Sequence, residues 1–212
     1  MLKIREKNFY FKLFFLILIL LSYYRSPFIF GNGRFISMDL AHHFRISALS
    51  IFDAFIYVDY AARYINLISN ISSIISTRFF DLSYAQFVPV YLSFFVYLII
   101  FYLILFKKSY LFEKNYLKFL GALICLVAPT LSFEIWLNAI NIQVYFGILG
   151  LIILFLKEDE NNYTHSLLLF IGGFCGIYTC LLTPLFFLKY IYKKNFYDLL
   201  NFIILAFYCL IQ

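Results

Sequence analysis

The stretch FVPVYLSFFVYLIIFYLILF, at positions 87–106, decides the class of fold. It contains no charged side chain, and Lys107 and Lys108 follow it directly. A helix of about twenty apolar residues crosses the hydrocarbon core of a bilayer, which is about 30 Å thick. The stretch therefore predicts a transmembrane helix whose lysine end faces the cytoplasm, because cytoplasmic loops are rich in Lys and Arg.

The composition of the whole chain agrees with this prediction. Of its 212 residues, 64% are hydrophobic and 13% are charged, whereas charged residues make up about 25% of a soluble domain. A chain of this length cannot bury so much apolar surface in a core of its own. We expect an all-α fold, a polytopic transmembrane bundle of about five to seven membrane helices, some of half length, forming a single membrane domain over residues 1–212.

The first span is predicted at residues 9–24, behind a basic N-terminus that contains Lys3, Arg5 and Lys7. Those charges indicate that the span begins in the cytoplasm. Residues 22–27 contain no A-x-A-like cleavage site, so we expect a retained signal anchor.

Residues 25–86 are too evenly charged to cross lipid and contain no lysine, which favours the outer side of the membrane. Some sixty residues without structure would be unusual in a compact protein. Apolar residues recur at helical intervals over 38–52 and 55–75, so we predict two or three amphipathic helices along the membrane surface. Pro27, Gly31 and Gly33 predict the turn that leads into them.

The C-terminal half is predicted to hold the remaining spans. Residues 119–156 contain two spans that are joined outside, and residues 157–165 lie inside. Residues 166–192 form either a helical hairpin or a single span, and the hairpin is favoured because it keeps the lysines at both ends in the cytoplasm. A last span covers 199–211, and because it runs to Gln212 without a polar cap we expect a fragment of a longer polytopic protein.

Several function classes are disfavoured. The net charge is +6, but the basic residues cluster at the ends of apolar runs, as in membrane proteins, so no nucleic-acid partner is expected. The four cysteines lie in apolar stretches without a C-x-x-C spacing or a nearby His, so no metal site and no cofactor are expected. Glycine-rich nucleotide-binding loops and the common hydrolase motifs are missing from the sequence.

Asp39 is the leading candidate for chemistry. On a helix it shares a face with His42 and His43, and a carboxylate beside imidazoles and guanidiniums can act as a general base on an acceptor hydroxyl. The alternative is a solvated helix whose acid is balanced by its neighbours. The two histidines are interpreted as interfacial residues rather than metal ligands, because adjacent positions on a helix point about 100° apart.

Besides His42, two further sets of residues are candidates for substrate binding. Arg63 could clamp a phosphate through its planar fork, or it could contact lipid head groups or pair with Asp59 one turn earlier. Glu134, Asn138 and Asn141 are predicted to form one helical stripe at the outer end of two spans, with a hydrated loop as the alternative.

Four features together resemble bacterial membrane proteins similar to the C-type, polyprenyl-phosphate-sugar-dependent glycosyltransferases. They are an acid in the first outer loop (Gly33, Arg34, Asp39), an aromatic stretch bearing Asn (Tyr60, Arg63, Tyr64, Asn66), the run EIWLNAINIQ at 134–143, and Gly173-Phe-Cys-Gly176 leading to Thr183-Pro184-Leu185.

The resemblance implies an enzyme of the bacterial inner (cytoplasmic) membrane whose outer loops form a cavity at the membrane surface. It implies that Asp39 deprotonates the acceptor, that Arg63 contacts the phosphate, and that the partners are membrane lipid and a polyprenyl-phosphate sugar donor. The alternatives are a non-catalytic membrane subunit or lipid-handling partner in envelope polysaccharide assembly, and thirdly a transporter.

Overall fold

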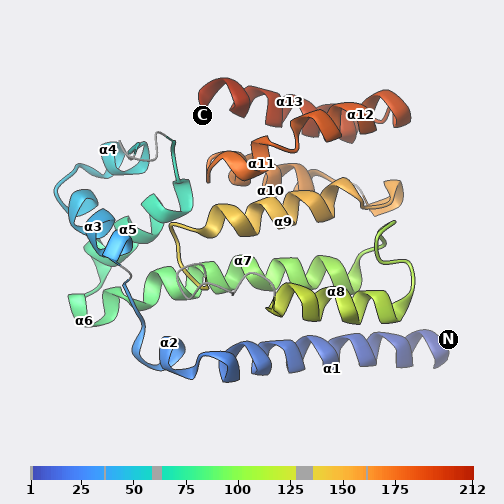
Figure 1. Cartoon of the computed structure of the whole chain (residues 1–212), viewed down its shortest axis with the longest axis horizontal. Helices are drawn as coiled ribbons and strands as arrows, with labels where there is room; N and C mark the ends of the chain where they lie inside the picture. The colour runs from blue at the N-terminus through green and yellow to red at the C-terminus, as the bar shows by residue number, and fades with distance from the viewer. Residues whose placement is uncertain (1, 36, 59–63, 128–135, 161) are drawn as a thin grey trace.

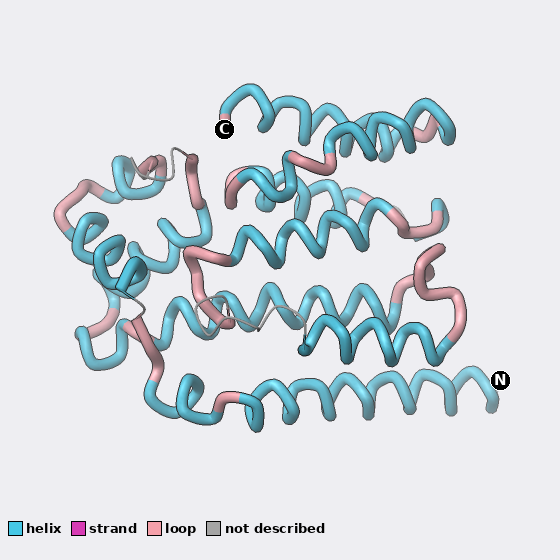
Figure 2. Tube along the Cα trace, viewed as in Figure 1, coloured by secondary structure: helices cyan, strands magenta, loops and turns pink. Residues whose placement is uncertain are grey.

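The computed structural model describes residues 2–35, 37–58, 64–127, 136–160 and 162–212. Over these ranges the chain is helical and forms no strand, apart from two isolated bridges between loop residues (Figure 2). The prediction of an all-α fold is confirmed.

One group of helices runs side by side between two ends of the molecule (Figure 1), and we call it the bundle. Helix α7 packs against α1, α8 and α9, and α13 packs against α10 and α12. The bundle consists of α1 (Leu2–Arg25), α7 (Phe87–Phe106), α8 (Asn115–Val127), α9 (Ile142–Leu154), α10 (Tyr163–Gly173), the short α11 (Ile177–Cys180), α12 (Thr183–Lys193) and α13 (Phe196–Ile211).

A second group of shorter helices gathers at one end of the bundle, on the left of Figure 1, and we call it the cap. Its helices are α2 (Pro27–Asn32), α3 (Ser37–Ser47), α4 (Ile51–Phe55), α5 (Leu67–Phe79) and α6 (Leu82–Ala85). At the opposite end are the loops that join α7 to α8, α9 to α10 and α12 to α13 (Figure 1). We call these loops, with residues 107–114, 157–160 and 194–195, and the helix ends beside them the lysine end.

Helix α7 has the bounds that the sequence predicts. The short cap helix α6 directly precedes it, and the two together form one long helical segment. Within the described ranges, one helix is long and apolar enough to cross a membrane, Leu82–Phe106 with 25 residues, and its length is about 37 Å. Shorter apolar helices accompany it at Asn115–Val127, Ile142–Leu154 and Phe196–Ile211. The finer expectation, of about five to seven membrane helices, stays a prediction.

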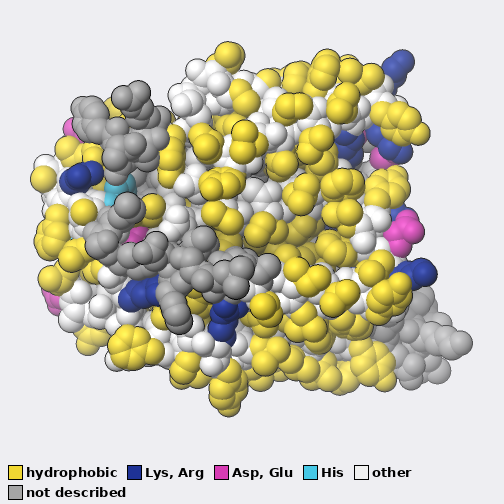
Figure 3. All heavy atoms as spheres, in the orientation of Figure 1, with side chains coloured by type: hydrophobic (Ala, Val, Ile, Leu, Met, Phe, Trp, Pro, Cys, Tyr) yellow, Lys and Arg dark blue, Asp and Glu magenta, His cyan; other side chains and the backbone are white. Residues whose placement is uncertain are grey.

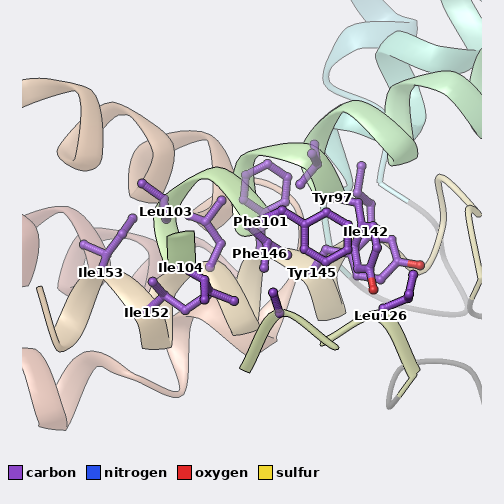
Figure 4. Close-up of a cluster of buried hydrophobic side chains, with 14 of the residues drawn as sticks. Tyr97, Phe101, Leu103, Ile104, Leu126, Ile142, Tyr145, Phe146, Ile152 and Ile153 are labelled. Atoms are coloured by element: carbon purple, nitrogen blue, oxygen red, sulfur yellow. The ribbon is translucent and has the colours of Figure 1, made fainter. Parts of the chain in front are cut away.

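The core of the bundle is mainly apolar, although a few polar side chains such as Asp198 and Asn201 are also buried. Its centre is the contact between α7 and α9 (Figure 4), where Tyr97, Phe101, Ile104 and Tyr145 are fully buried. Helices α10 and α13 approach so closely that a Cβ added at Gly173 would overlap the ring of Tyr208.

The predicted turn at Pro27, Gly31 and Gly33 is wrong for its first two residues. Pro27 begins α2, because a proline fits the first helical position, where its missing N–H is not needed. Gly31 lies inside this helix, and Gly33 ends it with a φ of 63°. A side chain at Gly33 would also collide with Gln86, so this position requires glycine.

Residues 166–192 do not form one continuous helix. Helix α10 ends at Gly173, α12 begins at Thr183, and the chain reverses between them (Figure 1). Lys193, at the end of α12, lies 2.8 Å from Glu158, which precedes α10. The two charged flanks of this segment therefore lie together at the lysine end.

Candidate functional site

The polar residues of the cap lie mainly between α3 and α5. Helix α5 begins after Asn66, whose side chain accepts a hydrogen bond from the backbone N–H of Ser69 at 3.3 Å. In α5, small polar residues recur at helical spacing and so share one face, and all of them are buried: Ser69, Asn70, Ser72, Ser73 and Ser76.

The facing helix α3 contributes two buried histidines to this interface. The distance from His42 Nε2 to Asn70 Oδ1 is 3.0 Å, and that from His43 Nδ1 to Ser76 Oγ is 2.9 Å. Asn70 Nδ2 donates to the carbonyl oxygens of Phe55, at 3.1 Å, and Tyr57, at 2.9 Å. Since those two acceptors fix the orientation of the amide, its Oδ1 accepts from His42, which carries a proton on Nε2.

Asp39 lies in the first turn of α3 and is 6% exposed. A negative charge there is favoured by the helix dipole. Burial lowers the pKa of the Arg34 guanidinium, and the nearby charge of Asp39 opposes that shift. Arg34 Nη2 also donates to the carbonyl oxygen of Trp136 at 2.5 Å. An acid and a cation are thus brought together where the cap meets the bundle.

A cavity of about 30 Å³ adjoins this interface. It is lined by His42, Tyr57, Tyr64, Asn66, Ser69, Asn70 and Ile140. Two hydrogen bonds close its bundle side, from Asn66 Nδ2 to the Ile140 carbonyl oxygen at 2.7 Å and from Gln143 Nε2 to the Tyr64 hydroxyl at 2.6 Å. Its volume is enough for a water molecule, and its walls supply the polar partners that a buried water requires.

The predicted helical stripe of Glu134, Asn138 and Asn141 is wrong for its described members. Asn138 and Asn141 lie in turns before α9, which begins at Ile142. Leu137 has a φ of 52°, a left-handed conformation that interrupts a helix. Asn138 is buried, and its Oδ1 accepts the backbone N–H of Ile140 at 2.7 Å, so it stabilises the turn.

Arg63 and Glu134 lie outside the described residues, and their predicted roles stay predictions. Asp39 and His42 do lie on one helix, as expected, and both are buried. Within the described part of the chain, no group of three or more His, Cys, Asp or Glu side chains could hold a metal ion.

The sequence analysis did not single out Asn70 or the serines of α5. The signal was present, since Ser69, Asn70, Ser73 and Ser76 recur at three- and four-residue intervals. In an amphipathic helix this pattern predicts that the polar face contacts water, whereas in the structure the polar face is buried.

The cap has, in part, the reverse of the usual polarity. Polar residues are buried between α3 and α5 and several large apolar side chains are outside, although charged side chains such as Asp53 and Asp81 are exposed as well. Phe44 is 55% exposed, Phe52 71% and Phe79 75%. The bundle also exposes many apolar side chains along its length (Figure 3). Polar groups therefore mediate the contact between α3 and α5, and the outer surface of the cap includes large apolar side chains.

The lysine end has the ordinary arrangement, with ion pairs at its surface. The hydrogen bond between Lys108 and Asp159, together with their opposite charges, raises the pKa of the lysine and lowers that of the acid. The ion pairs of this end are Lys107–Glu160, Lys108–Asp159, Lys157–Glu113 and Lys193–Glu158. A further pair, Lys189–Asp198, is buried between α12 and α13.

No protein-family model, no curated protein and no solved structure matches this chain.

Proposed function

We propose that this chain is an integral membrane protein of the bacterial inner membrane, with the cap at the outer interface and the lysine end in the cytoplasm. The single observation that carries the proposal is the reversed polarity of the cap, where Asp39, His42 and Asn70 are buried while Phe44 and Phe52 are exposed.

In water this arrangement would be unfavourable. Each exposed Phe would forgo about 1.5–3 kcal/mol of hydrophobic stabilisation, and each buried polar group would still have to be desolvated. In the interfacial region of a bilayer the apolar side chains face lipid. The apolar surface of the bundle and the length of Leu82–Phe106 support the same environment.

Two measurements test the membrane part of the proposal. After cell breakage and an alkaline carbonate wash, the full chain should remain with the membrane pellet. In a chain whose native cysteines are replaced by alanine, Asp81→Cys should react with an impermeant maleimide from the outside, and Lys108→Cys should react only after permeabilisation. Release by carbonate, or labelling of both positions from one side, contradicts the proposal.

Within this membrane protein, Asp39 acts as the general base of a lipid-linked-sugar-dependent glycosyltransferase. Its carboxylate takes the proton of an acceptor hydroxyl, whose oxygen bonds to the anomeric carbon. The bond from that carbon to the phosphate oxygen breaks, and polyprenyl phosphate leaves with the electron pair. The sequence resemblance supports this role. The buried carboxylate near Arg34 supports it as well, because burying an acid costs free energy, and buried acids in membrane proteins therefore usually have a function.

The Asp39→Asn variant tests this activity. Transfer of sugar from a polyprenyl-phosphate donor to an acceptor should fall by about 100-fold or more, the usual contribution of a general base. Asp81→Asn is the matched control, since Asp81 is an exposed cap acid without a side-chain capping bond. Membrane insertion should be unchanged in both. Equal transfer by the two variants would contradict the role of Asp39.

A specific observation favours the second candidate function, that of a non-catalytic membrane subunit or lipid-handling partner. His42 and His43 bond to Asn70 and Ser76, so these polar groups already stabilise the contact between α3 and α5. For a subunit of this kind, Asp39→Asn leaves polysaccharide assembly unchanged, and the chain co-purifies with a partner. A transporter is less well supported, because the buried carboxylates among the described residues are on different elements, Asp39 on the cap helix α3 and Asp198 in the first turn of α13, which follows a loop of the lysine end.

A further inference from the structure

A second cavity lies near the lysine end, between α7 and α10. Its volume is about 350 Å³, within the range of cavities that hold small ligands. Tyr102 and Leu103 of α7 and Leu168 of α10 form its apolar wall. Tyr102 is 46% exposed, so the cavity extends to the apolar surface of the bundle.

The polar side of the same cavity consists of hydrogen-bond donors. Lys107, at the end of α7, and Asn162, Thr164 and His165, at the start of α10, line it. His165 is 3% exposed, and its Nδ1 has no hydrogen-bond partner among the described residues. A buried imidazole nitrogen without a partner is costly, which indicates a group that the cavity is built to meet.

Among the described residues, Lys107 is the one charged side chain that lines this cavity, and it is paired with Glu160. Lys107 Nζ lies 3.0 Å from Glu160 Oε2, and an ammonium has three N–H donors, so this contact leaves donors for another acceptor. Glu160 does not line the cavity, and neither does any other acid in the described ranges. An anionic oxygen could therefore approach Lys107 and His165 without facing a carboxylate in the wall.

We propose that this cavity binds the head group of an anionic phospholipid from the cytoplasmic leaflet. A phosphate oxygen accepts hydrogen bonds from Lys107, Thr164 and His165, and an acyl chain follows Tyr102 and Leu168 along the bundle. Basic pockets between membrane helices on the cytoplasmic side are suited to anionic lipids. The inference rests on the membrane part of the proposed function, and it is independent of the role of Asp39.

Lipid retention by the purified full chain tests this site. The protein is incubated in detergent with equal amounts of phosphatidylglycerol and phosphatidylcholine, and bound lipid is counted by native mass spectrometry. The protein should retain about five to ten times more phosphatidylglycerol than phosphatidylcholine, which is the effect expected of one charged contact near a membrane surface. Excess inorganic phosphate should not displace it, because the apolar wall contacts the acyl chain.

Two double variants with the same net charge separate this cavity from general surface attraction. Lys107→Gln with Glu160→Gln removes the cavity cation without leaving its acid unpaired, and it should abolish the preference. Lys108→Gln with Asp159→Gln removes an exposed pair outside the cavity and should keep it, since the side chains of Lys108 and Asp159 are 64% and 53% exposed.

Each remaining outcome contradicts the lipid site. Equal retention of the two lipids, the same loss in both double variants, or displacement by inorganic phosphate overturns it. Carbonate extraction of the same preparation distinguishes this failure from failure of the membrane proposal. A chain that stays in the membrane but shows no lipid preference refutes only the cavity assignment.

Discussion

Replacing Asn70 with Leu removes three hydrogen bonds that join α5 to His42 of α3, to Phe55 of α4 and to Tyr57. Asn70 is fully buried, so the His42 ring and the carbonyl groups of Phe55 and Tyr57 would each lose a partner away from bulk water. A typical intramolecular hydrogen bond contributes about 1 kcal/mol, so the three together contribute about 3 kcal/mol. A water in the adjoining cavity of about 30 Å³ can satisfy one partner, which reduces the expected loss to about 2–3 kcal/mol.

Hydrogen exchange of backbone amides measures this loss directly. The opening equilibrium of the cap should rise by about 30- to 150-fold, since 1.4 kcal/mol corresponds to a factor of ten. The increase should appear in the amides of α3 and α5, while those of α7 and α9 should exchange as in the parent protein.

Thr77→Val is the matched control for this experiment. It lies on the same helix, and its hydroxyl donates only to Ser73 and Ile74 of its own helix, at 2.8 and 3.2 Å. The substitution keeps the shape of the side chain and breaks no contact between helices. An Asn70→Leu protein whose α3 and α5 amides exchange less than threefold faster, or no faster than those of Thr77→Val, refutes the polar interface as the source of cap stability.

Three further predictions concern backbone strain, pH and surface charge. Gly33→Ala should lower the free energy of unfolding by about 1–3 kcal/mol because of its φ of 63°, whereas Gly31→Ala, which has open space around it, should be neutral or stabilising in thermal unfolding. Burial lowers the pKa of His43 below its ordinary 6.5, so its contribution to stability is present above pH 6.5 and is lost as the pH falls below it. His43→Gln should accordingly flatten the fall of Tm between pH 7 and 5, and an unchanged slope would contradict this. Lys108→Gln should leave Tm unchanged, because exposed ion pairs contribute little.

The sequence predicts both ends of α7 correctly, because a polar residue directly flanks the apolar run on each side. Polar Gln86 precedes the apolar run, and Lys107 ends it. The start of α5 is marked in a similar way, since Asn66 can cap a helix, yet the predicted amphipathic segment began earlier, at residue 55. The spacing of apolar residues does not reveal a capping residue, so the predicted segment began well before the true start of α5 at Leu67.

The interior of the cap could not be predicted from the same pattern. The alternation of serine and isoleucine in α5 gives a period, but it does not say which face is buried. In water the apolar face would be buried, whereas beside lipid the preference can reverse. The helical stripe predicted for Asn138 was wrong for a different reason, because the positive φ of Leu137, which interrupts the helix, depends on its surroundings rather than on its own side chain.

The two ends of the molecule differ in what they offer to a reactant. At the lysine end, charged side chains such as Lys108 and Asp159 are exposed, as in contact with water. At the cap, Phe52 and Phe79 are exposed while Asp39 is buried. Beside a membrane, a substrate carried on a lipid lies at the same surface as these exposed rings. If the cap is at the outer interface and Asp39 is the general base, as proposed, a soluble nucleotide-activated sugar should not replace the polyprenyl-phosphate donor in the transfer assay.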